Sequence, residues 1–388
     1  MGVVIDYTSG FFEAAPTGET VGSISGNATL DLTSGNVFSH TPTANTTFAF
    51  SNPPASGTGY DFTLKVTGAN VASGYDLANA SYDSVSFSVS AKANYPAGLW
   101  FKPDGTKMYT SDPAQILTFT GVIEYNLSTA WDITTATHNQ DFDVSSSTAQ
   151  AQAVVFKDDG TKMYLSNAST NTLYQYSLST PWDISTTSYD TKSLDASTQE
   201  SQLTKAFFKP DGTKVFLTGG IGDAVYEYAL STAWDISTST YVATFSVSSQ
   251  EIAPSSLFFT PDGTKMFLGG VVTDAIYQYS LSTAWDLSTS SYDNVSFSLS
   301  SQDTVPQAVF FKPDGSKMYV SGAANDTIFQ YSTSGTAAAA TFSYPSSVKW
   351  AGGTAPTAPA NGETDVYSFF TTDGGTNYYG FQAGDALA

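Results

Sequence analysis

The sequence predicts an all-β fold in which a five-bladed β-propeller is inserted into a split β-sandwich. The first observation behind this prediction is a motif of the type FKPDGTKMY, whose copies start 51 to 55 residues apart. The copies begin at Phe101, Phe156, Phe208, Phe259 and Phe311. A repeat near 50 residues with several short strands is typical of a propeller blade. The second observation is that strand-like segments of a different character flank the repeats on both sides.

Each repeat is expected to contribute four strands. The first strand ends at the Pro-Asp-Gly turn, where an Asp-Gly pair favours a tight hairpin because glycine tolerates positive φ. The second strand alternates polar and apolar residues, as in KMYV at 317–320. The third strand has the form AIYQYSL, at 275–281, and the fourth has the form VSFSLS, at 295–300.

A second motif, of the type YSLSTAWDIST, keeps step with the first and contains a Trp-Asp pair. We interpret its tryptophans as packing residues that fix the connection between the third and fourth strands. They are Trp131, Trp182, Trp234 and Trp285. The aspartates of the hairpin turns are interpreted as turn formers rather than as cooperating carboxylates. They are Asp104, Asp159, Asp211, Asp262 and Asp314.

The ends of the repeat region indicate how the ring closes. The fourth strand occurs five times, but its first copy, Val85–Ser90, precedes the first blade, and no copy follows Tyr331. We therefore expect the N-terminal copy to complete the fifth blade. This places the propeller at residues 69–335. The flanks, residues 1–68 and 336–388, are each too short for a core of their own, and together they would form one β-sandwich of ordinary domain size.

Composition and charge narrow the possible functions. The chain has 388 residues and no cysteine, and 35 Asp and Glu against 14 Lys and Arg give a formal charge of −21. This negative field argues against a nucleic-acid partner, and the chain has no apolar run long enough for membrane insertion. His40 and His138 lie in different segments, and no nucleophile motif occurs. We therefore expect no metal, no cofactor and no enzymatic activity, with a polysaccharide depolymerase that uses two carboxylates as the remaining catalytic alternative.

The flanking segments resemble a known kind of protein. They contain LDLTSGNVFSHTPTANTTFAFSNPPASGT at 30–58, YPSSVKWAGGTAPT at 344–357 and DVYSFFTTDGGTNYYGF at 365–381. These strings are similar to a small β-module of virion proteins from tailed bacteriophages, particularly marine phages, and the propeller repeats are similar to repeats inserted in such proteins. The resemblance covers about a third of the chain. It carries no catalytic motif.

The resemblance implies a structural appendage on the outside of the virion, such as a tail fibre, a tail spike or a head fibre. The flanking module would dock to other virion proteins and form a homo-oligomer, most simply a trimer. The resemblance leaves open whether the protein belongs to the tail or to the capsid. It also leaves open a decoration or scaffold protein that binds no ligand.

Variation among the repeats points to a candidate binding surface. The hairpin turns and the Trp-Asp connections are nearly identical in every copy, whereas the loops between the second and third strands and the crossings between blades differ. Blade geometry places these variable loops on one face, which we expect to bind a host-surface carbohydrate or protein. The expected ligand-binding residues are Tyr95, Gln152, Asn167, Gln199, Glu200, Gln202, Gln250, Glu251, Gln302 and Asp303.

Overall fold

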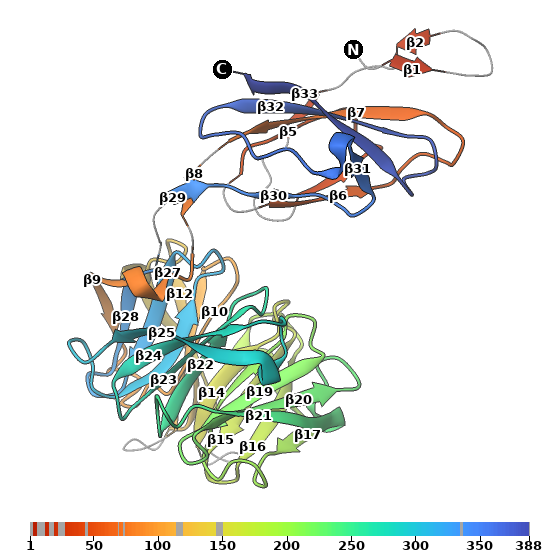
Figure 1. Ribbon diagram of the computed structural model, residues 1–388. Helices are drawn as coiled ribbons and strands as arrows, with labels where there is room; N and C mark the ends of the chain where they lie inside the picture. Colours follow the sequence, from red (N-terminus) through yellow and green to blue (C-terminus); the bar gives the residue numbers. More distant parts are fainter. Residues whose placement is uncertain are drawn as a thin grey trace. The chain divides into compact units, whose positions relative to one another are not determined.

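A computed structural model of the chain describes residues 3–5, 12–14, 19–21, 28–42, 46–68, 70–72, 74–113, 119–144, 150–333 and 337–387. The chain forms two compact units (Figure 1). The propeller unit is Gly74–Ser334, and the sandwich unit combines Met1–Ser73 with Gly335–Ala388. The fold class is the one that the sequence predicts, and the units divide after residues 73 and 334 rather than after 68 and 335.

The described part of the propeller unit contains five antiparallel sheets of four strands, each sheet being one blade. Blade one consists of β10 (Gly98–Phe101), β11 (Lys107–Asp112), β12 (Gly121–Leu127) and β13 (Ala136–Asp143). Blade two consists of β14 (Ala151–Phe156), β15 (Lys162–Asn167), β16 (Thr172–Leu178) and β17 (Thr187–Asp195). Blade three consists of β18 (Leu203–Phe208), β19 (Lys214–Gly219), β20 (Ala224–Leu230) and β21 (Ser239–Ser246).

Blade four consists of β22 (Pro254–Phe259), β23 (Lys265–Gly270), β24 (Ala275–Leu281) and β25 (Ser290–Ser298). Blade five consists of β26 (Pro306–Phe311), β27 (Lys317–Gly322), β28 (Thr327–Ser332) and β9 (Ser81–Ser88). One turn of 3-10 helix leads into each outer strand. These turns are η1 (Leu77–Asn79), η2 (Ile133–Thr135), η3 (Ile184–Thr186), η4 (Ile236–Thr238) and η5 (Leu287–Thr289).

The ring closes through strands from the two ends of the propeller unit, which confirms the predicted closure. β9 pairs antiparallel with β28, with Ile328 opposite Phe87 and Ser332 opposite Ser81. The strand starts earlier than the predicted Val85, because the outer strand follows directly on its 3-10 turn. Val89, just beyond the strand, is buried in the propeller core.

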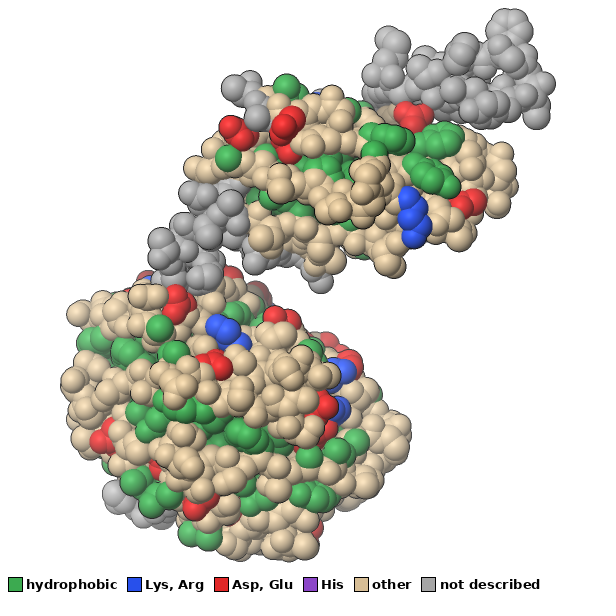
Figure 2. Space-filling model, in the orientation of Figure 1, with side chains coloured by type: hydrophobic (Ala, Val, Ile, Leu, Met, Phe, Trp, Pro, Cys, Tyr) green, Lys and Arg blue, Asp and Glu red, His purple; other side chains and the backbone are tan. Residues whose placement is uncertain are grey.

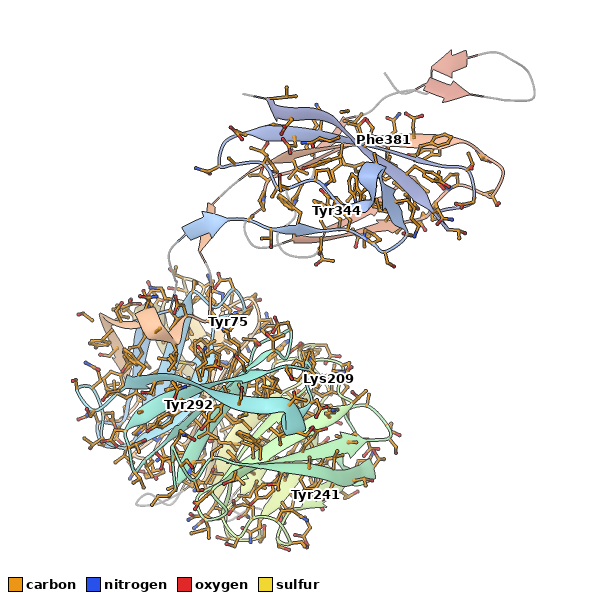
Figure 3. All side chains as sticks on the ribbon, in the orientation of Figure 1. Tyr75, Lys209, Tyr241, Tyr292, Tyr344 and Phe381 are labelled. Carbon is orange, nitrogen blue, oxygen red and sulfur yellow. The ribbon has the colours of Figure 1, made fainter. Side chains whose placement is uncertain are left out.

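The fifth copy of the Trp-Asp motif was missed in the sequence because tyrosine replaces its tryptophan. Tyr75 (Figure 3) has a φ of 60°, close to the 66° of Trp131, and its N–H donates a 2.8 Å hydrogen bond to the carbonyl of Gly315. Trp131 makes the same bond to Gly105 at 2.9 Å. The segment from Gly74 onward is therefore the last connection of blade five, and the propeller unit begins there.

The hairpin glycines and the motif aromatics are mutually dependent. Gly105 has a φ of 74°, and a Cβ at this position would collide with the indole of Trp131. Each turn thus needs glycine for its conformation and also for the close approach of the ring. The aspartates act as turn residues: Asp104 Oδ1 accepts from the N–H of Thr106 at 3.0 Å. The geometry agrees with the packing and turn roles inferred from the sequence.

The sandwich unit has one large and one small sheet. The large sheet has the order β3 (Glu19–Val21), β5 (Val37–His40), β7 (Tyr60–Thr67), β32 (Thr364–Thr371), β33 (Tyr378–Leu387) and β31 (Val348–Trp350). The small sheet has the order β30 (Phe342–Ser343), β6 (Thr46–Ser51) and β4 (Ala28–Asp31). Two further strand pairs are β1 (Val3–Ile5) with β2 (Phe12–Ala14), and β8 (Asn70–Ala72) with β29 (Ala337–Ala339). A 3-10 turn, η6 (Ala351–Gly353), follows β31.

The two flanking segments share one core, as a split domain requires. β7 from the N-terminal flank pairs with β32 from the C-terminal flank from Thr67–Thr364 to Tyr60–Thr371. The rings of Phe62 and Phe369 on these strands stack at 4.9 Å. Phe50 of the small sheet contacts Phe62 edge-on at 5.0 Å, so the two sheets pack face to face.

Candidate functional site

The variable loops are tied together by hydrogen bonds. In blades three, four and five, a carboxylate in the crossing that enters the blade accepts from the loop between the blade's second and third strands. The crossings and these loops therefore share one face, which we call the variable face. The bonds run from Gly222 N to Glu200 Oε2 (3.1 Å), from Thr273 Oγ1 to Glu251 Oε2 (2.6 Å) and from Asn325 N to Asp303 Oδ2 (3.0 Å).

The three carboxylates are buried, and this corrects their predicted role as ligand contacts. Glu200 and Glu251 are 1% exposed, and Asp303 is 2% exposed. Each also accepts from a backbone N–H two residues later, at 2.7 to 2.8 Å. A carboxylate enclosed by such donors is stabilised by them and has no surface left for a ligand. These side chains hold the loops in place.

Asn167 and Gln152 were also predicted to contact a ligand, and this is wrong because both side chains are buried. Asn167 is 1% exposed, and its Oδ1 accepts from the N–H groups of Ser169 and Thr170 at 2.8 and 3.3 Å. It therefore shapes its own loop in blade two. Gln152 lies on the innermost strand β14, where its carbonyl accepts from the hydroxyl of Ser111 in blade one.

The other predicted residues keep accessible surface on the variable face. Gln202 is exposed, and Tyr95, Gln199, Gln250 and Gln302 are half-buried. Gln199 Oε1 accepts from the hydroxyl of the blade-three residue Tyr228 at 2.9 Å. Burial raises the pKa of Tyr95. Their location is compatible with ligand contact.

Three exposed aliphatic side chains on the variable face were missed. Ile221, Ile252 and Val272 are 61%, 55% and 56% exposed, in loops of blades three and four. Val271 and Ala253 join two of these loops through a backbone hydrogen bond of 3.4 Å. The available signal was an isoleucine or valine in a short loop of small and polar residues, where the turn does not need a branched aliphatic side chain.

A second candidate site, which we call the aromatic cup, lies at the opposite end of the strands. It is a cavity of about 400 Å³ between the hairpin turns. Aromatic residues that end the innermost strands form its walls, together with Tyr75 and Trp234. Its rim is formed by five exposed residues, one from each blade, that directly precede the Asp-Gly pair of the hairpin turn. They are Pro103, Asp158, Pro210, Pro261 and Pro313. These residues belong to the repeat motif, and the sequence alone does not show that they converge at one end of the propeller.

Aromatic rings close the floor of the cup. Phe258 contacts Phe207 at 5.2 Å and Phe310 at 5.7 Å, and Phe310 contacts Trp100 at 5.3 Å. On the other side of these rings, the space between the innermost strands contains a cavity of only about 20 Å³. The cup is therefore a blind depression, and a ligand in it would be held against aromatic faces.

One buried cation lies on an innermost strand. Lys205 of β18 is 5% exposed, and its Nζ donates to the carbonyl of Thr204 at 3.3 Å. Burial lowers the pKa of Lys205 to about 7. The described residues contain no group of three or more His, Cys, Asp or Glu side chains that could hold a metal ion.

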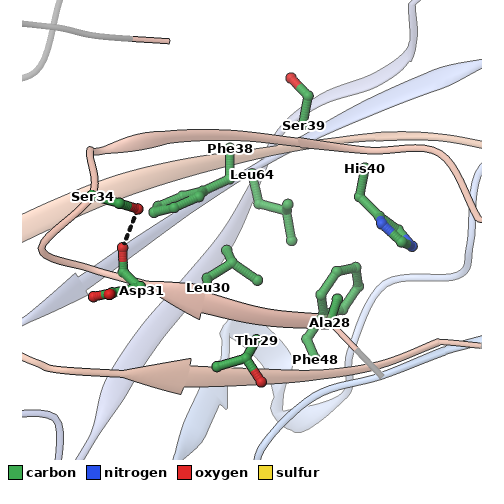
Figure 4. A pocket seen from close by; sticks show the side chains of 10 residues that line it. All are labelled: Ala28, Thr29, Leu30, Asp31, Ser34, Phe38, Ser39, His40, Phe48 and Leu64. Carbon is green, nitrogen blue, oxygen red and sulfur yellow. Dashed lines mark hydrogen bonds between the residues drawn. The ribbon is translucent and has the colours of Figure 1, made fainter. Parts of the chain in front are cut away.

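The sandwich unit contains a smaller cavity, of about 140 Å³ (Figure 4). Its lining is mainly apolar and includes Leu30, Phe38 and Leu64. His40 lies at one end, with Nε2 3.0 Å from the hydroxyl of Thr46, and burial lowers the pKa of His40. A neutral histidine in an apolar environment fits a core position.

The chain thus combines a five-bladed β-propeller unit with a split β-sandwich unit. No protein-family model and no curated protein matches the chain. A functionally unknown protein from Desulfotomaculum acetoxidans is 12% identical, with a TM-score of 0.38 over 58% of this chain and 65% of that one. A periplasmic gluconolactonase from Pseudomonas aeruginosa is 13% identical, with a TM-score of 0.37 over 63% of this chain and 70% of that one.

A protein from Lactobacillus plantarum is 17% identical, with a TM-score of 0.37 over 58% of this chain and 63% of that one. The match thus spans less than two thirds of the first and third of these proteins. The likeness concerns the fold alone. Among the described residues, no helix is both long and apolar enough to cross a membrane.

Proposed function

We propose that this protein is an exterior virion appendage of the fibre or spike type, and that its propeller attaches to a host-surface carbohydrate. The resemblance of the flanking strings to phage β-modules supports the virion role. The observation that carries the attachment role is the set of buried carboxylates on the variable face. They fix the backbone of loops whose exposed side chains differ from blade to blade.

Fixed loops matter because ordering a mobile loop on binding costs free energy. On the variable face the loop backbones are already held by Glu200, Glu251 and Asp303. The face combines amide groups, as in Gln202, with aliphatic groups, as in Ile252. The hydroxyl groups of a sugar ring can form hydrogen bonds with the amide groups, and its C–H groups can pack against the aliphatic groups. The formal charge of −21 favours a neutral ligand over an anionic one.

The sandwich unit supports the docking part of the proposal. Tyr379 and Phe381 are exposed on β33, and Phe370 lies opposite Tyr379 on β32. Hydrophobic side chains gather on this unit where Phe381 is labelled (Figures 2 and 3). We propose that this apolar face joins copies of the chain into a trimer or docks them to other virion proteins. Several propellers on one particle would raise a weak single-site affinity by about 10² or more.

The test is binding of the labelled full-length chain to an array of neutral bacterial surface glycans. The variant carries Gln202→Ala, Ile252→Ser and Gln302→Ala together, which alters exposed side chains and leaves the carboxylates intact. The matched control carries Ser128→Ala, Ser231→Ala and Ser282→Ala at exposed positions of the Trp-Asp connections. We expect the variant to lose binding by about tenfold or more, and the control to bind as the unmodified chain does.

Two outcomes would contradict attachment by this face. Equal binding by the variant and the unmodified chain would place the site elsewhere. Absence of glycan binding by the unmodified chain would favour the decoration or scaffold alternative. Release of sugar from the polysaccharide would instead indicate a depolymerase.

A further inference from the structure

We propose that the aromatic cup binds a small organic cation of the alkylammonium class. The cup lies at the opposite end of the strands from the variable face, so this site is separate from the proposed attachment site. Its volume of about 400 Å³ falls within the range of about 300–1,000 Å³ usual for small-molecule sites.

The expected charge of the ligand follows from the rim of the cup, where one blade has a different residue from the other four. Four blades place proline there, and blade two places Asp158. Among the residues that the structure describes, Asp158 is the one carboxylate that lines the cup. Within the described part of the chain no ion pair or hydrogen bond is formed by Asp158; the adjacent Lys157 attracts it electrostatically but pairs directly with Asp159, at 2.6 Å. A free carboxylate beside an apolar cavity favours a ligand with an apolar body and one positive charge.

The walls suit the same ligand. The face of an aromatic ring attracts a cation, and the attraction increases when the cation is removed from water. The chain provides an example, because Lys157 Nζ lies 5.9 Å from the centre of the Trp234 ring. Partial burial of Asp158 and the charge of Asp159 raise the pKa of the Asp158 carboxyl.

The charge requirement can be tested with two molecules of the same shape. Choline, which carries a quaternary ammonium, is the probe, and its uncharged carbon isostere 3,3-dimethyl-1-butanol is the matched control.

The experiment measures binding of both probes to the full-length chain by calorimetry and by tryptophan fluorescence, since Trp100 and Trp234 line the cup. We expect choline to bind about tenfold more tightly than the neutral alcohol. Asp158→Pro installs the residue that the other four blades carry and so keeps the turn. It should abolish the preference for choline and leave binding of the alcohol unchanged.

Two controls make the result decisive. Asp158→Asn removes the charge while keeping the size of the side chain, and it should act as Asp158→Pro does. Asp385→Asn removes one negative charge from the sandwich unit and should leave choline binding as it was. Equal binding of the two probes, absence of choline binding, or a preference that survives both Asp158 substitutions would overturn the proposal.

Discussion

The hydroxyl of Tyr319 in blade five donates a hydrogen bond of 2.7 Å to the backbone carbonyl of Trp131 in blade one. The same bond joins Tyr109 to Trp182 at 2.8 Å and Tyr164 to Trp234 at 2.6 Å. The junction between the last and first blades therefore carries the same hydrogen bond as the junctions between blades one and two and between blades two and three. The ring is assembled from strands at the two ends of the propeller unit, and this bond helps to close it.

Substitution Tyr319→Phe is expected to lower the free energy of unfolding by about 1 kcal/mol, the usual net value of a buried hydrogen bond. Packing should survive, because Phe216 in blade three and Phe267 in blade four occupy the equivalent position. Chemical denaturation followed by tryptophan fluorescence measures the change. No loss of stability would show that the bond across the junction contributes nothing.

Glu251→Ala should destabilise the propeller unit by about 2–4 kcal/mol, because several buried donors lose their acceptor at once. Those donors include Ala253 N and Thr273 Oγ1. The nearby exposed Ser249→Ala is the control, and it should change stability by less than about 0.5 kcal/mol. If thermal melts show equal effects for the two substitutions, the carboxylate does not hold the loops.

Lys205 should make stability depend on pH. Burial lowers the pKa of the folded-state amine to about 7, whereas the unfolded lysine keeps a pKa near 10.4. Between these values the unfolded chain binds more protons than the folded protein, so the free energy of unfolding rises with pH. From pH 7 to pH 9 the rise should be about 2 kcal/mol.

The measurement is urea denaturation at pH 7 and pH 9. Lys205→Met keeps an unbranched side chain without the charge, so it should be more stable than the unmodified chain at pH 7 and show a much smaller rise. A rise of the same size in both proteins would assign the dependence to other groups.

The proposed self-association through the sandwich unit should be lost when its exposed aromatic face is made polar. Tyr379→Ser and Phe381→Ser together remove apolar side chains that make no contribution to the buried core. We expect light scattering to report a trimer for the unmodified full-length chain and a monomer for the variant. A monomeric unmodified chain at micromolar concentration would contradict the oligomer.

Much of the fold could be predicted because the repeat marks every hairpin turn. The Asp-Gly pair needs a local conformation that sequence alone specifies, and five copies in step leave one way to close the ring. Tyr75 escaped because the position requires an aromatic ring against Gly315, which either tyrosine or tryptophan supplies. The sequence motif contains tryptophan, so it does not identify Tyr75 as the equivalent residue, whereas the contact with Gly315 does.

The candidate site was less predictable, for a physical reason. Glu251 looks like any polar loop residue, and its burial depends on Thr273, which lies 22 residues further along the chain. Sequence proximity does not show which loop supplies the donors. The aromatic cup was missed likewise, because its lining is drawn from all five blades and each part alone resembles a structural repeat.

The most direct test of the attachment role is hydrogen–deuterium exchange of the full-length chain with and without the surface polysaccharide that the glycan array selects. The account predicts slower exchange in the variable-face segments that contain Gln202, Ile252 and Gln302, with exchange in the hairpin turns unchanged. Slower exchange confined to the sandwich unit, or no change anywhere at saturating polysaccharide, would contradict it.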